Sequence, residues 1–219
     1  MIMQSDKEYK ATKRIMLGEA TMNPDFINLA NFIDQTFGVK PINIIYDMMD
    51  DGKRPRLNIC FEFEHEEQIF KKKDRLGNFD KEKQKAIADR FREALREKKK
   101  YKVDNIWVCY SAFEPVAKIE ANEKVSKDKI MQLKKELNEK DLWEISKCFS
   151  QVTFFLYTDL QVKQFEHSDV RKLWADKYFD LLGAYNEFGY FKREEFNINL
   201  DSKENFDHNY EGNWFYYYR

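Results

Sequence analysis

Histidine and cysteine are the residue types that most often bind metals or attack substrates, and this chain of 219 residues has three of each. Cys-x-x-Cys, His-Glu-x-x-His and closely spaced His pairs are all missing, so the spacing of a metal site is not present. The cysteines stand among apolar neighbours, as in "WVCY" and "KCFS", which disfavours a reactive thiolate. The residues concerned are His65, His167, His208, Cys60, Cys109 and Cys148. We therefore expect no metal, no cofactor and no catalytic cysteine.

Other catalytic signatures are also missing from the sequence. It contains neither Gly-x-Ser-x-Gly nor either of the glycine-rich loops that bind phosphate. The 39 Asp and Glu residues are too many for any one pair to stand out. Asp47, Asp50 and Asp51 could hold a divalent cation, but they lack a calcium-loop pattern, and Gly52 beside them favours a solvated turn. We expect a protein that is not an enzyme, with an enzyme that uses dispersed carboxylates as an alternative.

Two lysine-rich runs bracket a predicted helix over residues 80–100. A ridge made by both runs, with interleaved aromatic residues to stack on bases, would suit a nucleic-acid-associated protein. The other explanation is that both are solvated ends of elements. A formal net charge of −1 provides no overall attraction to nucleic acid or to an anionic membrane. The runs comprise Lys71–Lys73 with Arg75 and Lys98–Lys100 with Lys102; the aromatic residues are Phe70, Phe79 and Tyr101.

The first half of the chain predicts helices and paired strands. Asn23 and Pro24 start a helix that Gly38 ends, with apolar residues at helical spacing between them. Alternating apolar residues over 42–46 and 57–63 predict an antiparallel hairpin. The helix over residues 80–100 follows, and then one or two strands over 104–122, bent near Pro115.

The second half repeats this order. Ser126 is a suitable N-cap for a helix, and a shift of its apolar stripe predicts a kink near residues 139–141. A strand-like segment, "QVTFFLYTDLQVKQFEH", precedes a strong helix, "SDVRKLWADKYFDLLGAYNEFGYF", and "EEFNINLD" and "NWFYYYR" favour strands.

Together these elements predict an α+β fold with antiparallel sheets and helices packed on one face. A duplicated αββαβ unit is one arrangement that fits. The expected domains are a lead-in over residues 1–22, a first unit over 23–125 and a second unit over 126–219 packed on the first. The chain has no apolar run long enough to cross a bilayer and no secretory signal at its start, and its cysteines are odd in number, so we expect a cytoplasmic protein.

One wider pattern resembles a known family. The helix ending near "TFGVKP", the strands "INIIYDMM" and "RLNICFEFE", the charged helix and "IWVCYSAFEPVAKIEA" look like the YezG-type immunity proteins of bacterial polymorphic toxin systems. The segment "FNINLDSKENFDHNYEGNWFYYYR" is similar to the acidic and aromatic tail of that family. The resemblance implies a cytoplasmic antitoxin that binds and blocks a cognate toxin domain.

We therefore expect a non-enzymatic protein-binding protein, with nucleic-acid association as the alternative. An acidic surface would attract a basic toxin by mimicking the charge of its substrate. The "NWFYYYR" segment could close the core as a strand, present one face to a partner, or stack on bases or sugars. The expected partner-binding residues are Asp47, Asp50 and Asp51 of the hairpin, and Asp201, Glu204, Asp207, Tyr210 and Trp214 of the tail.

Overall fold

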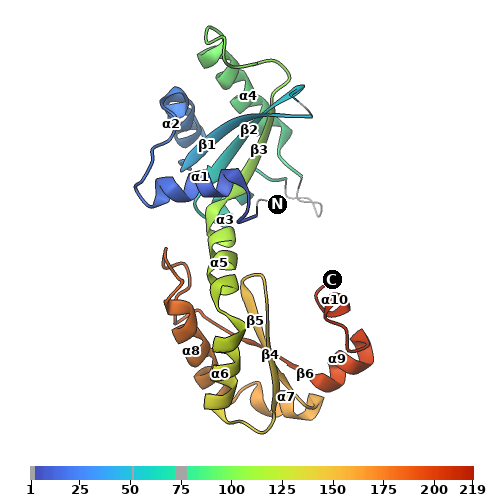
Figure 1. Cartoon of the computed structure of the whole chain (residues 1–219). Helices are drawn as coiled ribbons and strands as arrows, with labels where there is room; N and C mark the ends of the chain where they lie inside the picture. Colours follow the sequence, from blue (N-terminus) through green and yellow to red (C-terminus); the bar gives the residue numbers. More distant parts are fainter. Residues whose placement is uncertain (1–2, 51, 73–77) are drawn as a thin grey trace. The chain divides into compact units, whose positions relative to one another are not determined.

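The chain forms two compact units, Met1–Val116 and Ala117–Arg219. The computed structural model describes residues 3–50, 52–72 and 78–219 (Figure 1). In those ranges no helix combines the length and the hydrophobicity that crossing a membrane requires. The expected boundary at residues 125 and 126 follows helix α5, Phe113–Lys124, whereas the units divide within that helix.

The first unit contains a three-stranded sheet with strand order β1-β2-β3. Strands β1 and β2 form the predicted hairpin, with Ile44 opposite Ile59 and Tyr46 opposite Leu57, and β3 runs parallel to β2. Its elements are α1 (Lys7–Met16), the 3-10 turn η1 (Pro24–Phe26), α2 (Ile27–Phe37), β1 (Asn43–Met49), β2 (Arg54–Phe61), α3 (Glu64–Gln68), α4 (Lys81–Leu95) and β3 (Trp107–Ala112).

The second unit has a sheet of the same type, with order β4-β5-β6. Strand β4 is antiparallel to β5, and β6 is parallel to β5. Besides the end of α5, the unit contains α6 (Lys127–Leu137), β4 (Leu142–Cys148), β5 (Gln151–Leu156), α7 (Asp159–Phe165), α8 (Asp169–Gly183), β6 (Asn199–Ser202), α9 (Lys203–Tyr210) and α10 (Trp214–Tyr217).

The α+β class is confirmed, and both units follow one order: helix, two strands, a short helix, a longer helix and a strand. The third strand of each sheet is parallel to the second because the two helices between them return the chain to the end where the second strand began. Each sheet is therefore mixed, where the sequence predicted antiparallel pairing throughout.

One face of each sheet carries the hydrophobic core. In the first unit, Ile33 of α2 and Phe91 of α4 pack in one cluster with Leu57 and Ile59 of β2, all fully buried. In the second unit, Trp174 and Tyr178 of α8 pack with Phe154 of β5, and these side chains are also buried. The 3.6-residue spacing in the helices and the two-residue spacing in the strands direct these side chains to the same layer.

The opposite face of each sheet is covered by a different segment. Helix α1 packs on β1 in the first unit, where Tyr9 is buried and its ring stacks on Phe113. The second sheet is covered by α9 and α10 through Phe206 and Trp214. Residues 1–22, expected as a lead-in, thus contain a helix that belongs to the first unit.

Two predicted elements of the middle of the chain are wrong. Phe113–Lys124 is helix α5 and not a bent strand, because Pro115 stands in the first helical turn, where the missing N–H costs nothing. The predicted kinked helix ends at Asn138, which is left-handed with φ of 46°, and Leu142–Cys148 is strand β4. A bulge between Leu142 and Glu144 places Leu142 and Ile145 on one face at a helix-like spacing of three.

Two further segments are helical where strands were predicted. The segment after β5 forms α7, which begins with a capping box between Thr158 and Gln161. The "NWFYYYR" segment forms α10, whose N-cap Asn213 accepts a hydrogen bond from the backbone of Phe215.

Candidate protein-binding surface

Aromatic side chains cover the outer face of the second sheet. The indole of Trp143 on β4 lies parallel to that of Trp214 on α10, with centroids 6.1 Å apart. Phe206 of α9 lies 4.2 Å from Trp214, and Phe155 of β5 contacts Trp214 edge to face at 5.2 Å. Tyr217 of α10 joins them at 5.2 Å from Phe155. We call these five side chains the aromatic stack.

Helix α10 is fixed to the sheet by hydrogen bonds as well as by ring contacts. The hydroxyl of Tyr217 donates to Oδ2 of Asp201 on β6 at 2.5 Å, and the hydroxyl of Tyr218 donates to Oγ of Ser146 on β4 at 2.7 Å. Burial, together with the Asp201 carboxylate, raises the pKa of Tyr217, so its proton stays in the hydrogen bond at neutral pH. The short helix is thus held in one orientation on the sheet.

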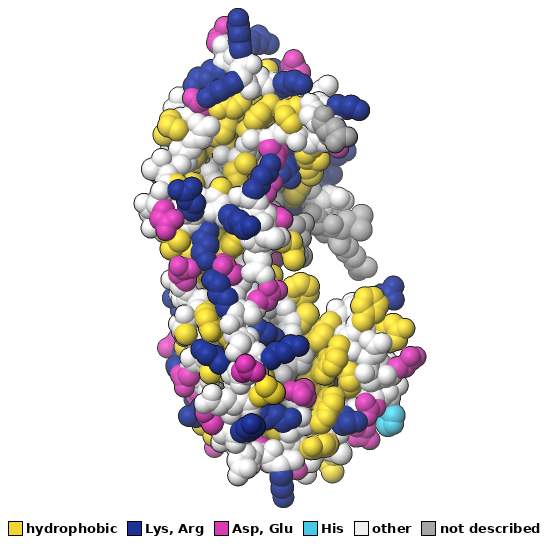
Figure 2. Space-filling view, in the orientation of Figure 1, with side chains coloured by type: hydrophobic (Ala, Val, Ile, Leu, Met, Phe, Trp, Pro, Cys, Tyr) yellow, Lys and Arg dark blue, Asp and Glu magenta, His cyan; other side chains and the backbone are white. Residues whose placement is uncertain are grey.

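The opposite side of α10 presents two aromatic rings to solvent. Trp214, Tyr217 and Tyr218 are spaced for one helix face, so Phe215 and Tyr216 project from the other. Phe215 is 68% exposed and Tyr216 is 45% exposed, with ring centroids 5.9 Å apart. We call these two residues the outward pair. In Figure 2, hydrophobic side chains gather over the face of the second unit that includes α10.

Most of the tail residues predicted to bind a partner have partners within the chain. Asp201 accepts the Tyr217 hydroxyl and also bonds Asn205, and Asp207 pairs with Lys203. These side chains hold α9 and α10 in place. The remaining three are Glu204, which accepts the backbone N–H of Asp159 at 3.0 Å, Tyr210, which packs on Tyr217, and Trp214 of the aromatic stack, which is 37% exposed.

The hairpin carboxylates lie in the first unit and differ among themselves. Asp47 accepts two hydrogen bonds from Arg56, at 2.9 and 2.6 Å, which hold its pKa below the usual range. Arg56 also pairs with Glu8 of α1, so Asp47 belongs to a mostly buried ion-pair network. Asp50 is exposed in the turn with φ of 50°, and Asp51 lies outside the described residues.

The three cysteines have raised pKa values. Cys60 and Cys109 are buried, and burial raises the pKa of Cys60 to about 11 and that of Cys109 to about 12. Burial also raises the pKa of Cys148. All three thiols therefore stay protonated at neutral pH. Within the part of the chain that the structure describes, no three His, Cys, Asp or Glu side chains gather as a metal site would require.

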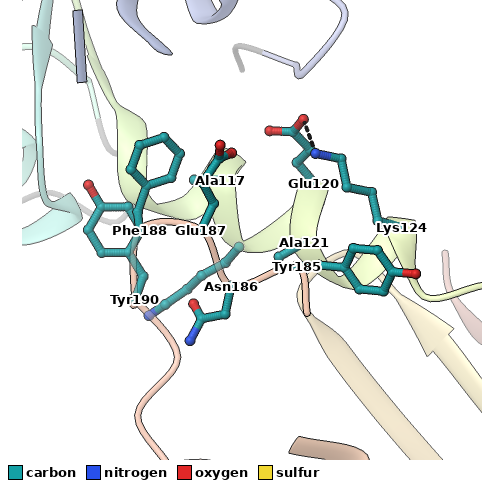
Figure 3. A pocket seen from close by; sticks show the side chains of 10 residues that line it. Ala117, Glu120, Ala121, Lys124, Tyr185, Asn186, Glu187, Phe188 and Tyr190 are labelled. Carbon is teal, nitrogen blue, oxygen red and sulfur yellow. Dashed lines mark ion pairs between the residues drawn. The ribbon is translucent and has the colours of Figure 1, made fainter. Parts of the chain in front are cut away.

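One small cavity lies between α5 and residues 185–190 (Figure 3). Ala117 and Ala121 line it on the helix, beside an ion pair of 2.9 Å between Glu120 and Lys124, and Tyr185 lies on the other side. Its volume is about 10 Å³, which is room for about one water molecule. This cavity is too small for a substrate or cofactor.

The described lysines of the two runs stand beyond opposite ends of α4, whose 15 residues span about 22 Å. Lys98 and Lys100 both pair with Asp25, and Lys71 pairs with Glu67 at 3.1 Å. Lys73 and Arg75 lie outside the described residues.

The outward pair is the feature that sequence reasoning missed, because a strand would have placed Phe215 and Tyr216 on opposite faces. The signal was present: Asn213 is a strong N-cap residue, and positions 214, 217 and 218 have helical spacing.

A scan against protein-family models, a search of the curated proteins and a search of the solved structures each found no match to this chain.

Proposed function

We propose that this chain is a non-enzymatic protein-binding protein and that the outward pair is the centre of its binding surface. The observation that carries the proposal is the exposure of Phe215 and Tyr216 on a helix whose other face is fixed to the sheet. Large aromatic residues exposed side by side are typical of interaction sites.

The way in which α10 is held supports this assignment. Binding costs conformational entropy when contact residues must become ordered, and a surface that is already ordered avoids part of that cost. The aromatic stack and the bonds from Tyr217 and Tyr218 order α10 in the free protein. Rigid aromatic anchors of this kind each contribute about 2 kcal/mol or more at binding hot spots.

We propose further that the partner is a bacterial toxin domain and that the chain is a cytoplasmic immunity protein. The support for this is the resemblance to YezG-type proteins described above. Electrostatic attraction of a basic toxin has less support than the aromatic contact, because Asp47, Asp201 and Asp207 are engaged by Arg56, Tyr217 and Lys203.

The test is affinity capture with a matched pair of variants of the full chain. The wild type should retain one stoichiometric protein partner from lysate of the source cell. The double variant Phe215→Ser, Tyr216→Ser should bind that partner at least about 30-fold more weakly, which corresponds to about 2 kcal/mol. Leu160→Ser is the control, since Leu160 is 65% exposed in the same unit but lies on α7.

The outcome that contradicts the proposal is a partner retained equally by wild type and by the double variant. The immunity function needs a second readout. Expression of the captured partner alone should stop growth, and co-expression of the wild-type chain or of Leu160→Ser should restore it. If the partner does not affect growth, the protein-binding proposal stands and the toxin assignment is wrong.

A further inference from the structure

A large open hollow lies in the first unit, between the start of β2 and the loop that precedes β3. Its volume is about 810 Å³, within the range of pockets that hold nucleotide-sized ligands. Three cationic side chains line it: Lys53 and Arg54 from the β2 side, and Lys102 from the loop. Tyr101 also lines the hollow, although its ring packs on Phe26, Tyr46 and Phe91. None of these groups belongs to the proposed protein-binding surface.

The three cations are not neutralised within the described part of the chain. Neither Lys53 nor Arg54 pairs there with a carboxylate, and the Lys102 ammonium reaches only the carbonyl oxygen of Gly52, at 3.4 Å. Arg54 lies over the ring of Trp107, 5.7 Å from its centroid. The neighbouring Lys100 differs, because it pairs with Asp25 at 2.5 Å. The charge at the hollow is thus available to an anion.

The loop adds backbone donors to these charges. The N–H groups of Val103, Asp104 and Asn105 have no hydrogen-bond partner among the described residues. Asn105 has φ of 53°, in the left-handed region. Successive free N–H groups around such a residue form concave sites that bind anions. Among the described residues that line the hollow, Asp104 carries the opposing charge; its side chain is 89% exposed and lies 3.8 Å from Arg92.

We propose that this hollow binds the phosphate of a nucleotide or of a single-stranded nucleic acid. Arginine, lysine and backbone N–H groups are the donors that recognise phosphate. The hollow is far larger than one phosphate group, so it has room for a sugar and a base beside the phosphate. The proposal is independent of the protein-binding function.

The test measures how binding depends on salt. The probe is a fluorescein-labelled oligothymidylate of about 16 nucleotides, and its binding to the protein is measured by fluorescence anisotropy. Three cations on a single strand predict a slope of log K against log salt of about −2, or about an 18-fold loss of affinity between about 50 and 200 mM salt. Replacing Lys53 and Lys102 by Gln should leave a slope of about −0.7 and a loss of about 2.6-fold.

A control variant separates the hollow from general positive charge. Lys10 and Lys40 are exposed in the same unit and do not line the hollow, so Lys10→Gln with Lys40→Gln should keep the slope of about −2. Circular dichroism of both double variants checks that they fold.

Competition distinguishes the two sources of phosphate. If adenosine monophosphate displaces the probe with an affinity equal to that of the oligonucleotide, the hollow is a nucleotide site; if only unlabelled oligonucleotide displaces it, the hollow is a strand site. The proposal is overturned if nothing binds at protein concentrations up to about 10⁻⁴ M. Equal slopes for the two double variants would also overturn it, and so would binding of poly-glutamate as tight as that of the oligonucleotide.

Discussion

Two neighbouring residues of α10 should respond in opposite ways to truncation. Replacing a buried aromatic residue by Ala costs about 3–5 kcal/mol of unfolding free energy. Trp214 is 37% exposed and keeps about two-thirds of that burial, so Trp214→Ala should cost about 2–3 kcal/mol. Phe215 is 68% exposed, and Phe215→Ala should change stability by no more than about 0.5 kcal/mol. Partner binding should show the reverse ranking: Phe215→Ala should weaken it more than Trp214→Ala, because the loss of Phe215 removes contact surface and not packing.

The assay is urea unfolding followed by tryptophan fluorescence. Trp143 and Trp174 remain in the second unit of both variants, and Trp107 of the first unit is the same in both, so a difference between their unfolding transitions reports on the second unit. Thermal unfolding of the same variants gives a second measure. For a unit of this size, each kcal/mol of lost stability lowers the melting temperature by about 4–8 °C, so Trp214→Ala should lower it by at least about 8 °C. Equal melting temperatures for the two variants would refute the assignment of inner and outer faces to α10.

Three further predictions concern the polar contacts of the two units. Arg56→Leu leaves Glu8 and Asp47 without their common partner and should cost about 3–5 kcal/mol in urea unfolding of the first unit, whereas a cost below about 1 kcal/mol would show that the network is dispensable. Because the pKa of Asp47 is lowered on folding, its stabilisation is present above its unfolded value of about 3.9 and is lost as the pH falls through the folded value. Acid titration followed by circular dichroism should therefore show a weaker loss of stability in Asp47→Asn, and an unchanged acid profile would contradict this. Lys147→Met removes the ammonium that donates to the carbonyl oxygens of residues 122, 123 and 125 at 2.7, 2.8 and 2.5 Å; it should cost about 1–3 kcal/mol and speed hydrogen exchange in that segment, and unchanged exchange would contradict the capping role.

The local pattern of the sequence predicts much of the fold. Asn23 and Gly38 mark the first predicted helix, and the alternation around Ile44 and Ile59 gives the observed hairpin. These predictions succeed because capping and period depend on neighbours within a few residues. The failures have local causes too: a bulge near Leu142 gives a strand the spacing of a helix, and aromatic residues with high β-propensity form α10.

The candidate surface was less accessible to sequence reasoning. Whether a carboxylate is free depends on residues far away in the chain: Arg56 reaches Glu8 across 48 positions, and Tyr217 reaches Asp201 across 16. No pattern in the sequence indicates these pairings. The choice of Trp214 came from its residue type, and the more exposed Phe215 and Tyr216 emerged only when the helix showed which rings face solvent.

The position of α9 and α10 in the chain also affects how the protein folds. All three strands of the second sheet precede these helices, and β6 ends at Ser202. A folding chain can therefore pair the strands before residues 203–219 dock on them. In that intermediate Trp143 and Phe155 lack the covering contacts of Phe206 and Trp214, and their side of the sheet is open to chaperones or to aggregation. Helix α1, in contrast, precedes the sheet that it covers, so the first unit emerges with its cover already made.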